Sequence, residues 1–235
     1  SCDEVALATG DSPRRLQRPK YLIQSRLGED VQSQFVNVLE PYNKIPFIQR
    51  VQALTIESEK DADGAVAVAV DLADGRRDIL ISCEQEMDVT VEGGIRFSGT
   101  FGMIRLVDGE VHLMRMVGGT LLAYGETELT ADQAAWCGKV VGVDASQAEN
   151  NVVLVDPPLP QDAGLVGRTV HFITDGPVDT SYEVKGITPD GISTGDITIV
   201  KGCRPDGGAG DKYTYLVNPG DEYVVPTVTG MGAEG

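Results

Sequence analysis

Histidine is scarce in this chain, which has only His112 and His171 among 235 residues. Histidine is the usual proton-transfer group near neutral pH, and a hydrolase triad needs one close to its nucleophile. Both histidines stand in strand-like strings, V-H-L and V-H-F, away from any nucleophile-elbow motif. We interpret both as half-buried or cross-strand side chains. The sequence therefore assigns no catalytic residue, and we expect the chain alone to be inactive.

Metal and redox motifs are also missing. The cysteines are far apart and show no C-x-x-C spacing, which excludes a zinc knuckle and a thioredoxin-like motif: Cys2, Cys83, Cys137 and Cys203. The acidic turn at 61–64 lacks the spaced ligands of an EF-hand and is interpreted as a solvated β-turn. The sequence assigns no metal ligand and no cofactor. It leaves the disulfide pairing open, from four thiols to two bridges.

Long apolar runs and positive charge are scarce as well. No run approaches the roughly 18 apolar residues that a membrane span needs. The chain begins at Ser1 without a signal peptide or an initiator Met, so we expect a processed or truncated piece. A net charge of −17 argues against nucleic acid and anionic membranes as partners. The exception is a basic strip, which is either solvated or faces an anionic partner: Arg14, Arg15, Arg18, Lys20 and Arg26.

Glycine is abundant, with 28 residues, and short apolar–polar alternations recur between Gly, Pro, Asn and Asp turns. This pattern predicts an all-β fold of two consecutive β-sandwich or barrel-like units with at most one short helix. We expect one unit over 1–128 and a small barrel or sandwich module over 129–235. The one helix is predicted at 128–135, with Thr130 as its N-cap.

Hairpins are the main local prediction. The Asp74-Gly75 and Asp108-Gly109 pairs lie between alternating runs and predict tight two-residue turns. Residues 21–26 and 33–40 are both strand-like and are expected to pair with each other. Tyr42 follows at the end of the second of these runs, where it either faces a ligand groove or caps the core with its ring.

Three strings in the first part of the chain resemble a known family. Tyr21-Leu22-Ile23-Gln24-Ser25-Arg26, Ser33-Gln34-Phe35-Val36-Asn37-Val38-Leu39-Glu40-Pro41-Tyr42 and Ile48-Gln49-Arg50-Val51 are similar to the C-terminal β-domain region of heparinase II/III-like polysaccharide lyases. Weaker strings at 138–141, 165–168 and 218–221 resemble a terminal β-module of some long members. The resemblance covers about a fifth of the chain with its stronger part.

This resemblance implies a helical toroid followed by β-sandwich domains, and β-elimination of uronic-acid glycans by the whole enzyme. The family's active-site residues lie on the helical domain and on an upstream part of the β-domain, whose motifs this sequence lacks. No catalytic residue is carried over, and Tyr42 is not equated with the family's catalytic tyrosine. The family also implies a periplasmic or extracellular location.

The leading interpretation is a non-catalytic C-terminal portion of such a lyase. Its expected partners are the upstream catalytic domain of the same polypeptide and an acidic polysaccharide, because an arginine fork binds a uronate carboxylate through two hydrogen bonds. The candidate ligand-binding residues are Arg14, Arg15, Arg18, Lys20, Arg26 and Tyr42. The alternatives are a stand-alone carbohydrate-binding module and a structural β-protein. The glycan and the oligomeric state stay open.

Overall fold

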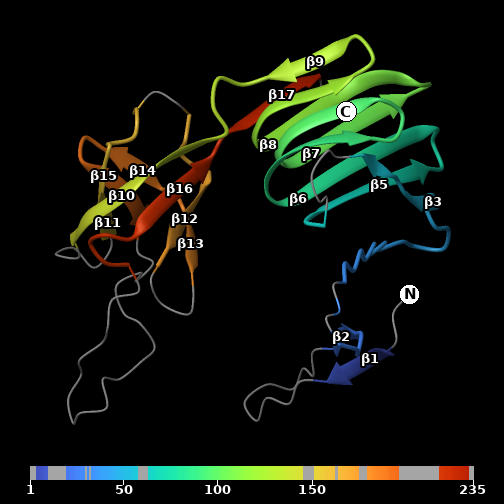
Figure 1. The fold of residues 1–235 in the computed structure, drawn as a ribbon, viewed down its shortest axis with the longest axis horizontal. Coiled ribbons are helices and arrows are strands. Elements are labelled where there is room, and N and C mark those ends of the chain that lie inside the picture. Colours follow the sequence, from blue (N-terminus) through green and yellow to red (C-terminus); the bar gives the residue numbers. More distant parts are fainter. Residues whose placement is uncertain are drawn as a thin grey trace. The chain divides into compact units, whose positions relative to one another are not determined.

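The computed structural model describes residues 4–9, 20–29, 31, 33–57, 63–144, 151–161, 164–174, 179–195 and 217–232. Within these residues the fold is all-β, with strands and no helix (Figure 1). The chain divides into two compact units, Ser1–Phe47 and Ile48–Gly235. The predicted all-β class is confirmed, whereas the domain division at 128/129 stays a prediction.

The predicted helix over 128–135 is wrong. Residues Thr127–Thr130 form strand β9, which pairs with the end of β8, and Ala135 already begins strand β10. Leu129 is buried in the core while Glu128 and Thr130 are exposed. That alternation has the period of a strand, and cross-strand pairing outweighs the local helix signal.

Unit 1 contains one antiparallel pair, β1 (Glu4–Thr9) and β2 (Lys20–Ser25). The register runs from Glu4 opposite Ser25 to Thr9 opposite Lys20. The predicted strand 21–26 is therefore confirmed to within a residue, but its predicted partner is wrong, because 33–40 is not a strand. The segment 4–9 contains the unbroken apolar run Val5-Ala6-Leu7-Ala8, and it is this segment that pairs with β2.

Unit 2 begins with an antiparallel sheet, called here the first sheet. Its strands are β3 (Ile48–Ala53), β4 (Ile56–Glu57), β5 (Ala65–Leu72), β6 (Arg76–Val91), β7 (Ile95–Val107), β8 (Glu110–Tyr124), β9 and β17 (Val228–Gly232). The order is β17-β8-β7-β6-β5-β3, with β4 added to β6 and β9 added to β8. Asp108 and Gly109 both adopt positive φ, 53° and 85°, as the predicted two-residue turn between β7 and β8 requires.

The three long strands bend in the middle, and the bend turns one sheet into a sandwich. The β6–β7 register breaks between Ser82 and Met87, and the β7–β8 register shifts between Ser98 and Gly99. At the bend a Cβ on Gly119 would lie 2.5 Å from the Ser98 carbonyl oxygen, so only glycine allows this approach.

Both halves of the bent strands contribute to one core. β5 and β17 pair with the first halves of β6 and β8, whereas β4 and β9 pair with the second halves. The core cluster joins the two half-sheets through Ala65, Ala67, Ala69, Ile79, Ile81, Cys83, Val89, Val91, Ile95, Phe97, Ile104, Leu106, Met114, Met116, Leu122 and Leu129.

The second sheet comprises β10 (Ala135–Asp144), β11 (Asn151–Asp156), β12 (Thr169–Ile173), β13 (Thr180–Glu183), β14 (Gly186–Thr188), β15 (Gly191–Gly195) and β16 (Glu222–Pro226). Its order is β13-β12-β16-β10-β11-β15-β14. The edge strands β13 and β14 are separated only by Val184 and Lys185. The Val184 amide donates to the Arg168 carbonyl, and the Lys185 amide donates to the Ser193 carbonyl, each at 2.8 Å. The sheet therefore curls until its two edges are joined, which makes it barrel-like.

The chain passes between the two sheets twice, at 131–134 and at Thr227. The Thr227 hydroxyl donates to the carbonyls of Gln133 (2.9 Å) and Ala134 (2.7 Å). Its amide also donates to Ala134, and its carbonyl accepts from the Gly118 amide, both at 2.9 Å. Thr227 thus ties the two crossings to each other and to the bend of β8.

Candidate functional site

The first sheet has a second apolar side in addition to its core. Successive side chains of a strand point to opposite faces, so the residues between the core positions of β5, β6, β7 and β8 share the other face. We call this the outer face. Its residues are Val66, Val68, Val70, Asp78, Leu80, Ser82, Phe101, Met103, Arg105, Leu113, Arg115 and Val117.

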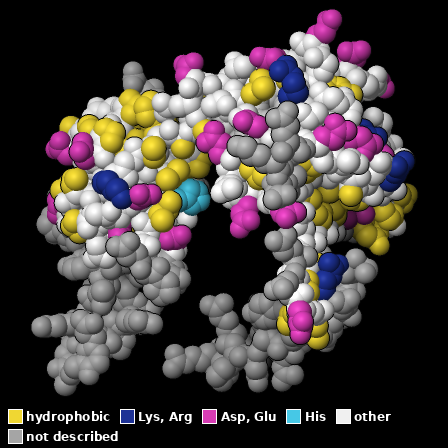
Figure 2. All heavy atoms as spheres, viewed as in Figure 1, with side chains coloured by type: hydrophobic (Ala, Val, Ile, Leu, Met, Phe, Trp, Pro, Cys, Tyr) yellow, Lys and Arg dark blue, Asp and Glu magenta, His cyan; other side chains and the backbone are white. Residues whose placement is uncertain are grey.

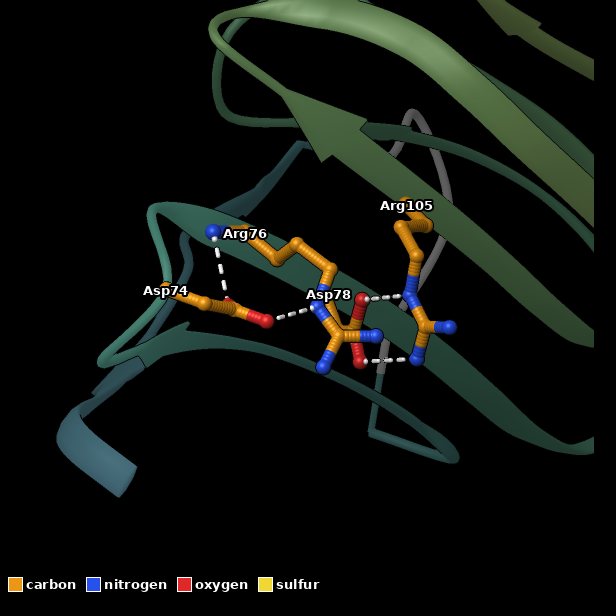
Figure 3. A network of polar contacts seen from close by, with 4 residues as sticks. All are labelled: Asp74, Arg76, Asp78 and Arg105. Carbon is orange, nitrogen blue, oxygen red and sulfur yellow. Dashed lines mark hydrogen bonds and ion pairs between the residues drawn. The ribbon is translucent and has the colours of Figure 1, made fainter. Parts of the chain in front are cut away.

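An ion pair lies in one row of the outer face. Asp78 is directly opposite Arg105, and the guanidinium donates from Nε to Oδ1 at 2.7 Å and from Nη2 to Oδ2 at 2.8 Å (Figure 3). The two side chains are 13% and 23% exposed, respectively. Val70 and Leu113 lie next to them in the same row; both are buried, yet neither belongs to the core cluster. The two hydrogen bonds fix the orientation of both side chains, and the charges of Asp78 and Arg105 cancel each other.

The neighbouring rows are almost entirely apolar. One row runs Val68, Leu80, Met103 and Arg115, and the next runs Val66, Ser82, Phe101 and Val117. The apolar members are half-buried, whereas an outward sheet face on water usually carries polar side chains. A contiguous apolar face of this kind is typical of a surface that contacts another protein surface.

Acidic side chains stand at both ends of the outer face. Asp74, Asp108 and Glu110 are exposed near the turns at one end, and Glu84 and Glu86 are exposed at the bend. Asp74 accepts from the Arg76 side chain at 2.6 Å (Figure 3). Figure 2 shows acidic side chains spread over the visible side of unit 2, with Lys and Arg much rarer.

Many cations of the described part are already paired with acids. The pairs are Arg76–Asp74, Arg77–Asp71, Arg96–Glu128, Arg105–Asp78, Lys139–Glu222 and Lys185–Glu183. Each of these cations is neutralised by its neighbour. These residues of unit 2 consequently offer little to an acidic glycan.

The sequence-predicted ligand residues lie mostly outside the described part. Arg14, Arg15 and Arg18 fall in an undescribed segment, and only the backbone of Lys20 is described, as the first residue of β2. Arg26 follows β2 and is half-buried, and Tyr42 is 59% exposed. The basic strip as a ligand site stays a prediction.

The two histidines occupy strand positions. His171 on β12 lies opposite Ser181 on β13, and its Nδ1 is 2.7 Å from the Ser181 hydroxyl. His112 on β8 is exposed. Within the described residues this serine–histidine contact is a cross-strand pair, and no hydrogen bond there joins the His171 ring to a carboxylate.

Two of the four cysteines lie in the described part of the chain. Cys83 is a buried free thiol whose pKa is raised by burial, and Cys137 is an exposed free thiol. Cys2 and Cys203 lie outside the described residues. In the described ranges no group of three or more His, Cys, Asp or Glu residues could hold a metal ion. No helix in the same ranges is long and apolar enough to cross a membrane.

Comparison with known proteins adds no relative: no family model, curated protein or solved structure matches this chain.

The sequence interpretation missed the outer face, although the sequence carries a signal for it. In Ala65-Val66-Ala67-Val68-Ala69-Val70 both alternating sets are apolar, as in a strand that is covered on both faces.

Proposed function

We propose that this chain is a non-catalytic β-structured part of a larger enzyme of the heparinase II/III-like lyase type, and that it docks through the outer face of the first sheet. The observation that carries the proposal is the apolar outer face with a neutralised Asp78–Arg105 pair near one end. Such a surface buries apolar area on docking and carries no unpaired charge from this ion pair into the contact.

The occupant is another domain of the same enzyme with an apolar patch and a basic rim. Charge complementarity supports this choice, because exposed acids stand at both ends of the outer face and the chain carries a net charge of −17. A second copy of this acidic chain would bring like charges together at the same rim. An acidic glycan would also meet carboxylates there.

The proposal assigns no reaction to the part of the chain that the structure describes. Neither histidine of the described part is joined to both a nucleophile and a carboxylate, and the acidic side chains flanking the outer face are exposed. β-Elimination needs a base at the C5 proton and a group that neutralises the uronate carboxylate. These functions belong to the partner domain in this proposal.

Oxidative footprinting of Met103 tests the docking. The isolated chain and the full polypeptide encoded by its gene are exposed to hydroxyl radicals, and sulfoxide at Met103 is quantified by mass spectrometry. We expect Met103 to be oxidised about tenfold more slowly in the full polypeptide, because docking covers the outer face. Core Met114, 0% exposed, is the internal control and should react slowly in both. Equal oxidation of Met103 in both samples, or a gene that encodes no further domain, contradicts the proposal.

Lyase activity is tested on the same two proteins with uronate glycans. Unsaturated product should form only with the full polypeptide. Turnover by the isolated chain that survives repurification would overturn the non-catalytic role.

Glycan binding by the basic strip is tested separately. Joint replacement of Arg14, Arg15 and Arg18 by Ala should weaken binding to an acidic polysaccharide and reduce the salt dependence of that binding. Unchanged binding would remove the glycan from the list of partners.

A further inference from the structure

We draw no further inference here: the strongest candidate, the exposed apolar surface of segment 33–40 in unit 1, carries nothing because nothing in the described part of the structure shows what covers it.

Discussion

The two sheets of unit 2 bury their apolar residues in different ways. The second sheet curls until its edges are joined at Val184 and Lys185, so its core lies inside one closed layer. The first sheet stays open and folds over on itself at the bend of β6, β7 and β8, and it carries apolar residues on its outer face as well as in its core.

The two sheets differ in whether apolar side chains remain outside the core, where a partner could contact them. A closed sheet satisfies both its edges and its apolar side within the same element. A folded open sheet has a second side on each half that lies outside its core, and among the described residues this second side is mostly apolar on one half. The contact surface that we propose for unit 2 therefore lies on the first sheet and not on the barrel-like second sheet.

The largest expected effect comes from filling the bend. Gly119→Ala places a Cβ 2.5 Å from the Ser98 carbonyl oxygen and 3.0 Å from the Gly99 Cα, both backbone atoms that cannot move aside cheaply. We expect a loss of about 3 kcal/mol in the free energy of unfolding of the first sheet. Gly186→Ala in the second sheet is the matched control, because its nearest contact would be an ordinary 3.7 Å from Ser193 Cβ.

Urea unfolding followed by two signals measures this effect. Trp136 is the only tryptophan and stands on β10, so its fluorescence reports the second sheet, whereas circular dichroism reports both. In Gly119→Ala the circular dichroism transition should move to lower urea more than the fluorescence transition does. Equal stabilities of the two alanine variants would show that the bend tolerates a side chain.

The next largest effect concerns the ion pair of the outer face. Asp78→Asn keeps the shape but removes the charge that accepts two hydrogen bonds from Arg105, and we expect a loss of about 2 kcal/mol. The double variant Asp78→Leu, Arg105→Met should lie close to the parent, because a partly buried pair can be replaced by apolar groups at little cost.

An exposed pair on the second sheet sharpens this comparison. Lys139 and Glu222 are 2.8 Å apart but 57% and 54% exposed, so Glu222→Gln should change stability by about 0.5 kcal/mol or less. Thermal denaturation at low and high salt measures both pairs. If Asp78→Asn and Glu222→Gln cost the same, the outer face is solvated like any other surface.

A smaller effect is expected at the two chain crossings between the sheets. Thr227→Val keeps the side-chain shape and removes the hydroxyl that donates to Gln133 and Ala134, and we expect a loss of about 1.5 kcal/mol. Thr227→Ser keeps the donor and should be closer to the parent. The rate of proteolysis within 131–134 measures how often this crossing opens. Identical rates in the parent and the Val variant would show that the hydrogen bonds of the Thr227 hydroxyl do not stabilise the crossing.

A still smaller effect than that of Thr227→Val is expected at neutral pH from Tyr223. Its hydroxyl donates to the Pro157 carbonyl at 2.5 Å, so Tyr223→Phe should cost about 1 kcal/mol. Burial, followed by the negative charges of Cys137 and Asp156, raises the pKa of Tyr223 to about 12. An unfolded tyrosine ionises near pH 10.

The sign of the alkaline effect follows from these two pKa values. Between pH 10 and about 12 the unfolded chain releases the Tyr223 proton while the folded chain keeps it, so the parent loses stability as the pH rises through this window. Tyr223→Phe lacks this loss, and its deficit should shrink above pH 10. Parallel stability–pH curves for the two proteins would contradict the raised pKa.

Local pattern predicted many strands correctly, and the reason is the period of two. Strand Ala65–Leu72 and the Asp108-Gly109 turn could be predicted. A short run of small apolar residues signals the strand, and an Asp-Gly pair signals a turn whose two residues both adopt positive φ. The pattern is less clear where glycines lie inside a strand: β7 runs unbroken through Gly99 and Gly102, because a glycine inside a strand marks a bend as readily as an end. The candidate site was not predicted, since Asp78 and Arg105 are 27 residues apart and only their register joins them.

The sequence by itself determined that this protein is all-β, where its tight turns lie and that histidine is scarce, because these depend on residue type and short-range periodicity. Only the tertiary structure decided that β2 pairs with β1, that one sheet folds at Gly119 while the other closes on itself, and that an ion pair stands on an apolar face. Strand register is the physical reason. It is a choice among competing long-range pairings, and the packing of the whole sheet makes that choice.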